Sequence, residues 1–195
     1  MINKERAIEI FKETEVLLEG HFLLTSGRHS NQYMQCAKIL QYPNYAEELA
    51  KGLAEEFKED SIDMVVGPAM GGIIIAYELA RQLNVKNLFT ERENGKMTLK
   101  RGFTIPKGAK VLVAEDVVTT GGSVFEVMDI VKEQGGEVAG VAVLVDRSNG
   151  TIDFGTKLRA ALTADVISYE AEECPLCKEG KLPIVKPGSR SINQK

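Results

Sequence analysis

The spacing of apolar residues predicts an N-terminal part with two helices separated by short extended segments. Residues Lys4–Leu18 place apolar side chains at helical spacing among charged ones, as an amphipathic helix does. The runs Phe22–Thr25 and Gln32–Cys36 flank the turn residues 26–28, a pattern typical of a small antiparallel pair. A second helical stripe runs from Ala46 to Phe57, and Asn44 is its expected N-terminal cap.

Beyond this stripe, strands alternate with helices. The expected strands are Met64–Val66, Val85–Thr90, Val111–Ala114 and Val138–Val145. Helices are expected at Gly72–Leu83 and after Ser123, where apolar residues again recur at helical spacing. Right-handed crossovers between such strands build a mostly parallel central sheet flanked by helices, so the sequence predicts an α/β fold.

Length and charge restrict the kind of protein. The 195 residues suffice for one substantial core, no linker rich in Pro, Gly or Ser divides them, and the chain turns irregular after Gly150. A net charge of −4 gives no overall attraction for nucleic acid. No signal-peptide segment and no run long enough to cross a bilayer is present. We therefore expect a single-domain cytoplasmic protein with no nucleic-acid and no membrane partner.

Two carboxylates and a turn rich in hydroxyls and glycines follow the strand Val111–Ala114. This unbroken apolar run is typical of a strand that is covered on both faces of a parallel sheet. Ligands of open α/β sheets bind at the carboxyl ends of the strands, where Glu115 and Asp116 are expected and can accept hydrogen bonds from sugar hydroxyls. The next residues suit an anion, because their hydroxyls, turning backbone amides and helix N-terminus all donate to it: Thr119, Thr120, Gly121, Gly122 and Ser123.

An ordinary strand-turn-helix is the alternative interpretation of this run, and the acid pair argues against it. The run matches neither the Walker pattern, which needs a Lys after the glycines, nor the dinucleotide fingerprint. It therefore predicts a site for a sugar phosphate.

Two further segments carry candidate chemistry. The glycine-rich loop Gly67–Gly72 follows a strand and opens a helix, so its backbone is expected at the same sheet edge, within reach of a second anion. The segment Glu91–Gly102 is polar and too long for a tight turn. It is either a solvated charged face or a mobile basic loop that closes over pyrophosphate.

Three cysteines are too few for a disulfide framework. Cys174 and Cys177 have the spacing of half a zinc knuckle, but no second Cys/His pair lies nearby, and His21 and His29 are far away in sequence. We expect a reduced pair with a structural or incidental role, so that chelators leave stability unchanged. A zinc shared between subunits and a redox pair are the alternatives.

The stretch Val111–Ser123 resembles the phosphoribosyl pyrophosphate (PRPP) signature of type I phosphoribosyltransferases over thirteen contiguous positions. Several other segments are similar to the orotate phosphoribosyltransferase family, so that the resemblance spans nearly the whole chain. They are the substrate segment Gly20–Ser30, the catalytic loop Glu91–Phe103, the orotate-side segment 145–147, and the tail with Cys174–Lys178 and Lys186–Arg190.

This resemblance implies a type I phosphoribosyltransferase core at about 43–148, a hood from about 1–40 and 150–185, and a polar tail at 186–195. It implies transfer of ribose 5-phosphate from PRPP to orotate with Mg²⁺, which PRPP mainly holds. Glu115, Asp116 and Lys96 would be catalytic, and Thr119 and Arg147 would bind orotate. PRPP would be bound by the acid pair, Val117, Val118, Thr119, Thr120, Gly121, Gly122, Ser123, Arg92, Lys96 and Lys100.

The family also implies a homodimer with shared active sites, in which the basic loop reaches into the neighbour's site. Thr25, Met70 and Glu93 depart from the pattern, because many relatives have basic residues there. Pyrophosphate would then depend on Mg²⁺, backbone amides and Lys96, Lys100 or Arg101. A phosphoribosyltransferase for another base and a non-catalytic PRPP-binding regulator are the alternatives.

Overall fold

The central feature of the fold is a six-stranded sheet in the order β5-β4-β3-β6-β7-β8. The computed structural model describes residues 3–24, 26–148, 150–164 and 167–187; Thr25 and residues 188–195 of the expected tail lie outside these ranges. All neighbouring strands are parallel except β4 and β5. The strands are β3 (Met64–Pro68), β4 (Lys86–Glu93), β5 (Lys96–Leu99), β6 (Lys110–Val118), β7 (Glu137–Asp146) and β8 (Leu158–Thr163).

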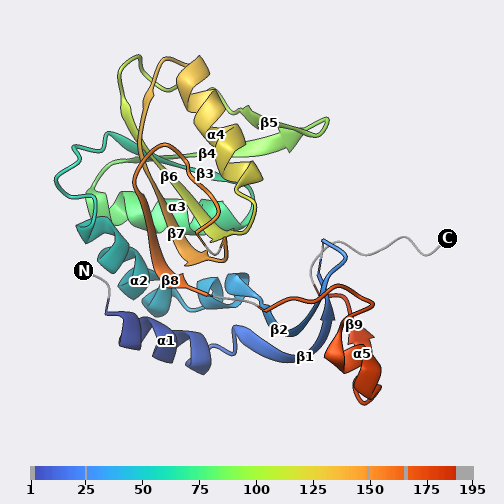
Figure 1. Cartoon of the computed structure of the whole chain (residues 1–195). Coiled ribbons are helices and arrows are strands. Elements are labelled where there is room, and N and C mark those ends of the chain that lie inside the picture. The colour runs from blue at the N-terminus through green and yellow to red at the C-terminus, as the bar shows by residue number, and fades with distance from the viewer. Residues whose placement is uncertain (1–2, 25, 149, 165–166, 188–195) are drawn as a thin grey trace.

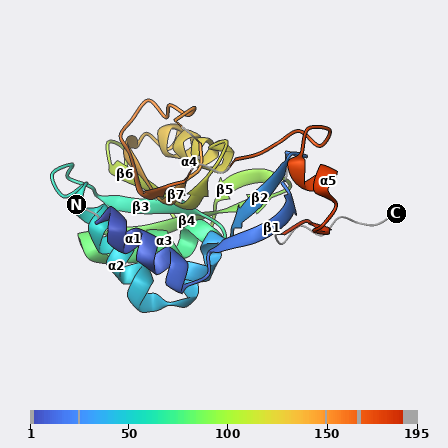
Figure 2. The ribbon, with the colours of Figure 1, turned by 60° about the horizontal axis from the view of Figure 1, so that its bottom comes forward.

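Helices cover both faces of this sheet. Helix α4 (Gly122–Glu133) lies on one face, and α1 (Lys4–Glu13), α2 (Pro43–Glu55) and α3 (Gly71–Leu83) lie on the other (Figure 2). Alternate residues of β6 enter the two resulting cores: Val111 and Val113 pack on the α4 side, and Leu112 and Ala114 on the opposite side. All four are fully buried, which explains why this strand is apolar without interruption. No helix of the described ranges is both long and apolar enough for a membrane span.

A second, smaller sheet lies at one end of the molecule. Strands β1 (Leu17–Leu23) and β2 (His29–Met34) form an antiparallel pair, and the short strand β9 (Ile184–Val185) adds to β1 in parallel. Helix α5 (Pro175–Glu179) lies beside them (Figure 1), and a 3-10 helix, η1 (Cys36–Gln41), connects β2 to α2. We call residues 17–34 and 167–187 the hood.

The sequence predicted the order of the core elements correctly, but several of its boundaries were wrong. The antiparallel pair expected at Phe22–Thr25 and Gln32–Cys36 lies at Leu17–Leu23 and His29–Met34. The first helix ends at Glu13 instead of Leu18, because Glu15 takes a left-handed conformation and the chain then enters β1. Helix α2 begins at Pro43, which suits the first turn, so its cap is Tyr42 and not Asn44. Strand β6 continues to Val118 because β7 pairs with it that far.

Two larger expectations also need correction. The segment Glu91–Gly102 is not one long loop, because Lys96–Leu99 pairs with the outer half of β4 as a hairpin. The region after Gly150 is not irregular hood throughout, because β8 pairs with β7 and belongs to the central sheet. Helix α1, which the sequence placed in the hood, contributes Ile10 and Phe11 to the core beside α2 and α3.

Candidate active site

The two acids of the signature lie within the last part of β6, side by side along the backbone. The backbone amide of Asp116 donates to Glu115 Oε1 at 3.0 Å, and the amide of Val117 donates to Asp116 Oδ1 at 2.8 Å. Glu115 is buried, with 9% of its surface exposed, and Asp116 is half-buried. Both carboxylates are therefore oriented by the strand itself, and Asp116 is the one that a ligand reaches more easily.

Burial and the neighbouring charge of Asp116 raise the pKa of Glu115 well above its ordinary range. The hydrogen bond from the Asp116 amide opposes this shift but does not cancel it. Without ligand, Glu115 therefore keeps its proton at neutral pH. Donors that arrive with a ligand would favour the ionised form of Glu115.

We expect Glu115→Gln to raise the melting temperature of the ligand-free protein by a few degrees at about pH 8. The folded wild type holds a proton that the unfolded chain releases, so its stability falls as pH rises from the ordinary carboxyl pKa of 4.5 through the raised value. Glutamine carries no such loss. Melting curves recorded across this range should show a gain that grows with pH. An exposed control, Glu133→Gln at the end of α4, should show a difference independent of pH, and the same flat profile for Glu115→Gln would contradict the raised pKa.

The turn after β6 forms an open cradle at the N-terminus of α4. Gly121 is the N-cap of α4 and adopts φ 75°, a conformation that favours glycine. No side chain of the described residues caps the first turn of this helix. The amides at this end are thus free for an anion. A pocket of about 220 Å³ lies here, lined by Arg92, Glu115, Val117, Val118, Thr119, Thr120, Gly121, Gly122, Ser123, Val124 and Glu126.

The glycine-rich loop Gly67–Gly72 approaches the acid pair more closely than a side chain would allow. A Cβ on Gly71 would lie 2.4 Å from Asp116 Oδ2, and a Cβ on Gly72 would lie 3.1 Å from Glu115 Oε1. A side chain at position 71 would therefore force either Asp116 or the loop to move. The sequence predicted that this loop lies at the same sheet edge as the acid pair, and the structure confirms that the loop lies against both carboxylates.

Arg147 follows β7 directly and lies at the same edge as the acids. Its backbone amide donates to the carbonyl of Val118 at 2.8 Å, and its Nε is buried with no hydrogen-bond partner among the described residues. Burial raises the pKa of Tyr33, while the nearby positive charge of Arg147 opposes this and Asp116 adds to it. The end of β2 thus lies within electrostatic reach of Arg147 and Asp116. The sequence gave no local signal for Tyr33.

The cations of the β4–β5 hairpin have different surroundings. Arg92 lines the pocket, pairs with Glu126 at 2.9 Å and donates to the carbonyl of Gly95. Lys100 pairs with Glu93 at 2.8 Å, and Arg101 pairs with Glu91 at 2.9 Å. These exposed pairs are weak, so a phosphate can displace them at low cost. Lys96 and Lys100 are absent from the described lining of the pocket.

Comparison with known proteins identifies the family. A profile described as the phosphoribosyl transferase domain matches residues 36–154. An orotate phosphoribosyltransferase from Pelotomaculum thermopropionicum is 59% identical over 191 residues, which cover 98% of this chain and 100% of the relative. The chain belongs to the orotate phosphoribosyltransferase family. The resemblance predicted from the sequence is thereby confirmed, as is the type I phosphoribosyltransferase fold.

Two other members of the orotate phosphoribosyltransferase family illustrate its range. The enzyme named so from Caldicellulosiruptor bescii is 59% identical over 189 residues, covering 97% of this chain and 99% of the relative. The crystal structure of orotate phosphoribosyltransferase from Aeropyrum pernix aligns with a TM-score of 0.69 at 28% identity, over 80% of this chain and 92% of that one. The Aeropyrum pernix enzyme thus shares the fold at 28% identity, well below the 59% identity of the two relatives above.

Proposed function

We propose that this orotate phosphoribosyltransferase family member transfers the ribose 5-phosphate of PRPP to orotate in pyrimidine synthesis, releasing orotidine 5′-phosphate and pyrophosphate. One observation carries the proposal: an oriented acid pair, an uncapped glycine turn and a buried unpartnered guanidinium lie at one edge of the sheet. The acid pair suits ribose hydroxyls, the turn suits a phosphate, and the guanidinium suits an acidic base.

The acid pair and the cradle would bind the two ends of the ribose phosphate. Asp116 and Glu115 would accept hydrogen bonds from the vicinal hydroxyls, because Glu115 lines the pocket and the half-buried Asp116 follows it directly in the strand. The amides of 119–123 and the hydroxyls of Thr119, Thr120 and Ser123 would hold the 5′-phosphate. The sugar would then be fixed at both ends, with its anomeric carbon between the pyrophosphate and the base.

The reaction demands stabilisation of opposite charges on either side of the anomeric carbon. As the bond to pyrophosphate breaks, the ribose gains positive charge, which the negative charge of Asp116 stabilises. The departing pyrophosphate would be bound by the amides of Gly67–Gly72 and by the hairpin cations, with Lys96 the catalytic one. Closure of the hairpin would exclude water that otherwise hydrolyses PRPP.

The family generally uses Mg²⁺ with PRPP, and the residues present fit this ion. Mg²⁺ prefers carboxylate and phosphate oxygens and binds proteins through one or two carboxylates plus substrate phosphates. The half-buried Asp116 offers such oxygens beside the place of the ribose hydroxyls. When bound, the ion would neutralise part of the charge of the pyrophosphate.

Arg147 and Thr119 would bind the base. The unpartnered Nε of Arg147 is a donor that lacks an acceptor, and the carboxylate of orotate supplies one. Thr119 is exposed at the start of the cradle and can donate from its hydroxyl. Orotate needs no strong general base once its ring has lost a proton, and the described residues at this edge offer no histidine.

We expect Arg147→Ala to raise the KM for orotate by about 10–100-fold, because it removes a charge-assisted hydrogen bond. The KM for PRPP should change much less. Initial rates with each substrate varied in turn measure both constants. Arg159→Ala removes an exposed arginine on β8 that pairs with Glu56, away from the acid pair, and it should leave both constants unchanged. Parallel shifts of the two constants in Arg147→Ala would make Arg147 a structural residue.

A homodimer with shared sites is part of the proposal. Met70, the N-cap of α3, and Ile74 and Tyr77 within this helix form an apolar stripe, with exposed fractions of 82%, 48% and 62%. Exposed apolar stripes of this kind mark protein interfaces.

Subunit exchange between two inactive variants tests this arrangement. If Lys96 and Asp116 of one site come from different chains, mixing Lys96→Ala with Asp116→Asn places both defects in one site of each hybrid. Random pairing makes half the dimers hybrids with one intact site, so about a quarter of wild-type activity should return. Each variant exchanged with itself is the control. If the mixture stays inactive although exchange is complete, the hairpin serves its own subunit.

Product formation tests the proposed activity. The purified protein should convert PRPP and orotate to equal amounts of orotidine 5′-phosphate and pyrophosphate, as followed by chromatography and mass spectrometry. Chelation of Mg²⁺ should stop the reaction, and added Mg²⁺ should restore it. Binding of PRPP without any product would favour a non-catalytic regulator and contradict the proposal.

A further inference from the structure

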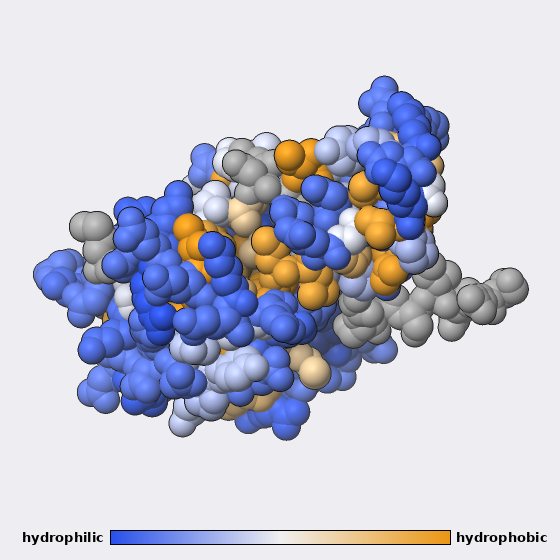
Figure 3. All heavy atoms as spheres, turned by 90° about the horizontal axis from the view of Figure 1, so that it is seen from below, coloured by the Kyte–Doolittle hydropathy of each residue, from blue (hydrophilic) through white to orange (hydrophobic). Residues whose placement is uncertain are grey.

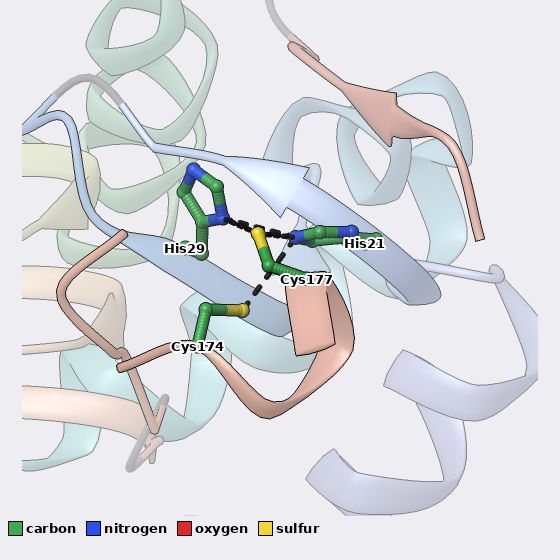
Figure 4. A group of neighbouring side chains, drawn as sticks. All are labelled: His21, His29, Cys174 and Cys177. Atoms are coloured by element: carbon green, nitrogen blue, oxygen red, sulfur yellow. Dashed lines mark hydrogen bonds between the residues drawn. The ribbon is translucent and has the colours of Figure 1, made fainter. Parts of the chain in front are cut away.

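Four side chains that can bind a metal converge in the hood. His21 lies on β1, His29 begins β2, and Cys174 and Cys177 flank the first turn of α5. Their ligand atoms all lie within 4.8 Å of one another, and Figure 4 shows that the side chains point toward a common centre. His21, His29 and Cys174 are at most 6% exposed, whereas Cys177 is accessible to solvent.

The close contacts of His21 in this cluster are more numerous than hydrogen bonding explains. His21 Nε2 lies 3.0 Å from His29 Nδ1 and 3.6 Å from both sulfur atoms of Cys174 and Cys177. One ring nitrogen has a single proton or a single lone pair, so it cannot satisfy three partners. Ligands of a tetrahedral zinc ion are separated by about 3.4 Å between nitrogens and about 3.6 Å between nitrogen and sulfur. The two sulfur distances from His21 match the nitrogen–sulfur edge, whereas the His21–His29 distance and the 3.2 Å between His29 Nδ1 and Cys177 Sγ are each about 0.4 Å shorter than the corresponding edge.

The surroundings of the histidines prepare them as ligands. His21 Nδ1 lies 3.3 Å from the carbonyl of Leu182 and can donate its proton there, which leaves the Nε2 lone pair directed at the cluster. The backbone of His29 is fixed by two hydrogen bonds with Tyr169, both 2.8 Å long. Through these contacts His21 and His29 tie the N-terminal hairpin to the C-terminal segment.

The C-terminal segment buries little apolar surface. Outside the cluster it is held by hydrogen bonds from Arg28 and Ser30 to residues 167–170 and by the pairing of β9 with β1. Neither hydrophobic core includes a described residue after Ala164, and no residue within α5 is buried. Ile184 and Val185 of β9 are about half exposed. Figure 3 shows hydrophobic patches within a mainly hydrophilic surface on this side of the molecule. Small segments without a core of their own depend on cross-links or metals for their stability.

We propose that His21, His29, Cys174 and Cys177 form a structural zinc site that fastens the C-terminal segment to the N-terminal hairpin. Two nitrogen and two sulfur ligands in a tetrahedral arrangement select zinc among the common metals, and four protein ligands leave no open position for catalysis. The exposed side of Cys177 gives the ion a path of entry. This proposal does not depend on the function proposed above.

The expectation that Cys174 and Cys177 lack partners is wrong. The two halves of the site are separated by 153 residues between His21 and Cys174, and only the fold brings them together. The distance in sequence between the histidines and the cysteines therefore did not exclude a site. Whether chelators leave stability unchanged stays a prediction, and a bound zinc would reverse it.

Metal analysis of the full chain tests the proposal. After dialysis, the wild type should contain about one zinc per chain by mass spectrometry, and Cys177→Ser should retain less than about a tenth of that. Cys36→Ser is the matched control, because Cys36 is a buried thiol outside the cluster, and it should keep its zinc. Absence of zinc from the wild type, or equal loss in both variants, would overturn the proposal.

Spectroscopy on the wild type covers the case in which Cys177→Ser fails to fold. Protein stripped of zinc by a chelator should melt at a lower temperature and recover when zinc is returned. Cobalt added to the stripped protein should produce the visible absorption of tetrahedral Co²⁺ and thiolate charge-transfer bands, saturating at one ion per chain. An octahedral spectrum without thiolate bands would contradict the proposed ligands.

Discussion

Asp116→Asn is expected to lower turnover by roughly two orders of magnitude or more. The variant keeps the shape of the side chain and an acceptor for the Val117 amide, but it removes the negative charge that stabilises the developing positive charge of the ribose. A single preorganised electrostatic contact of this kind is worth about 3 kcal/mol in the transition state. Turnover at saturating PRPP and orotate measures the effect directly.

Asp129→Asn provides the matched control for this substitution. Asp129 is an exposed acid on α4 with no proposed contact to a substrate, so its loss should leave turnover unchanged. Circular dichroism and melting curves should show that both variants are folded. Near-normal turnover in Asp116→Asn would remove this residue from the reacting centre.

Gly71→Ala is expected to lower turnover by about 100-fold without removing any functional group. The added Cβ would lie 2.4 Å from Asp116 Oδ2, so either the carboxylate or the glycine-rich loop has to move. Displacement of a catalytic group by about 1 Å can cost two orders of magnitude in rate. The same contact would misplace the two acids proposed to bind the ribose and the backbone amides of Gly67–Gly72 proposed to bind pyrophosphate.

Gly52→Ala separates this steric effect from a general effect of adding a methyl group. Gly52 lies within α2, where alanine favours the helix, so the protein should remain fully active and gain slightly in stability. Wild-type turnover in Gly71→Ala would show that the loop relaxes away from Asp116 and that the close approach has no catalytic importance.

The core and the cradle were predictable because their signals are local. The apolar run, the acids, the hydroxyl and glycine turn and the following helical stripe are contiguous from Val111 to Val131, and each part dictates its own conformation. Only the end of the strand was placed too early. Pairing with β7 extends β6 to Val118, a contact that no property of the acids themselves reveals.

The β4–β5 hairpin was overlooked because charged residues hide the strand pattern. Its outer half is an edge element, so Glu91, Arg92 and Glu93 need no apolar alternation. A usable signal was nevertheless present. Asn94 and Gly95 both adopt positive φ angles, 51° and 82°, and Asn-Gly between two extended runs is a strong hairpin marker.

The hood depended on contacts that sequence patterns do not encode. The strand β9 has only two residues, and its pairing with β1 joins the C-terminal segment to the N-terminal hairpin. The proximity of Tyr33 to Arg147 and the convergence of two histidines with two cysteines arise in the same way. Local spacing rules describe neighbours along the chain, and these groups are neighbours only after folding.

The specificity of transfer tests the central claim most directly. Purified protein is incubated with PRPP and Mg²⁺ together with orotate, uracil, hypoxanthine or adenine, and the loss of each base is followed by its absorbance. We predict rapid, PRPP-dependent consumption of orotate, since only orotate has a carboxylate that forms a charge-assisted pair with the guanidinium of Arg147, and little or no use of the other three. Consumption of a purine base or uracil at an equal or higher rate would contradict it.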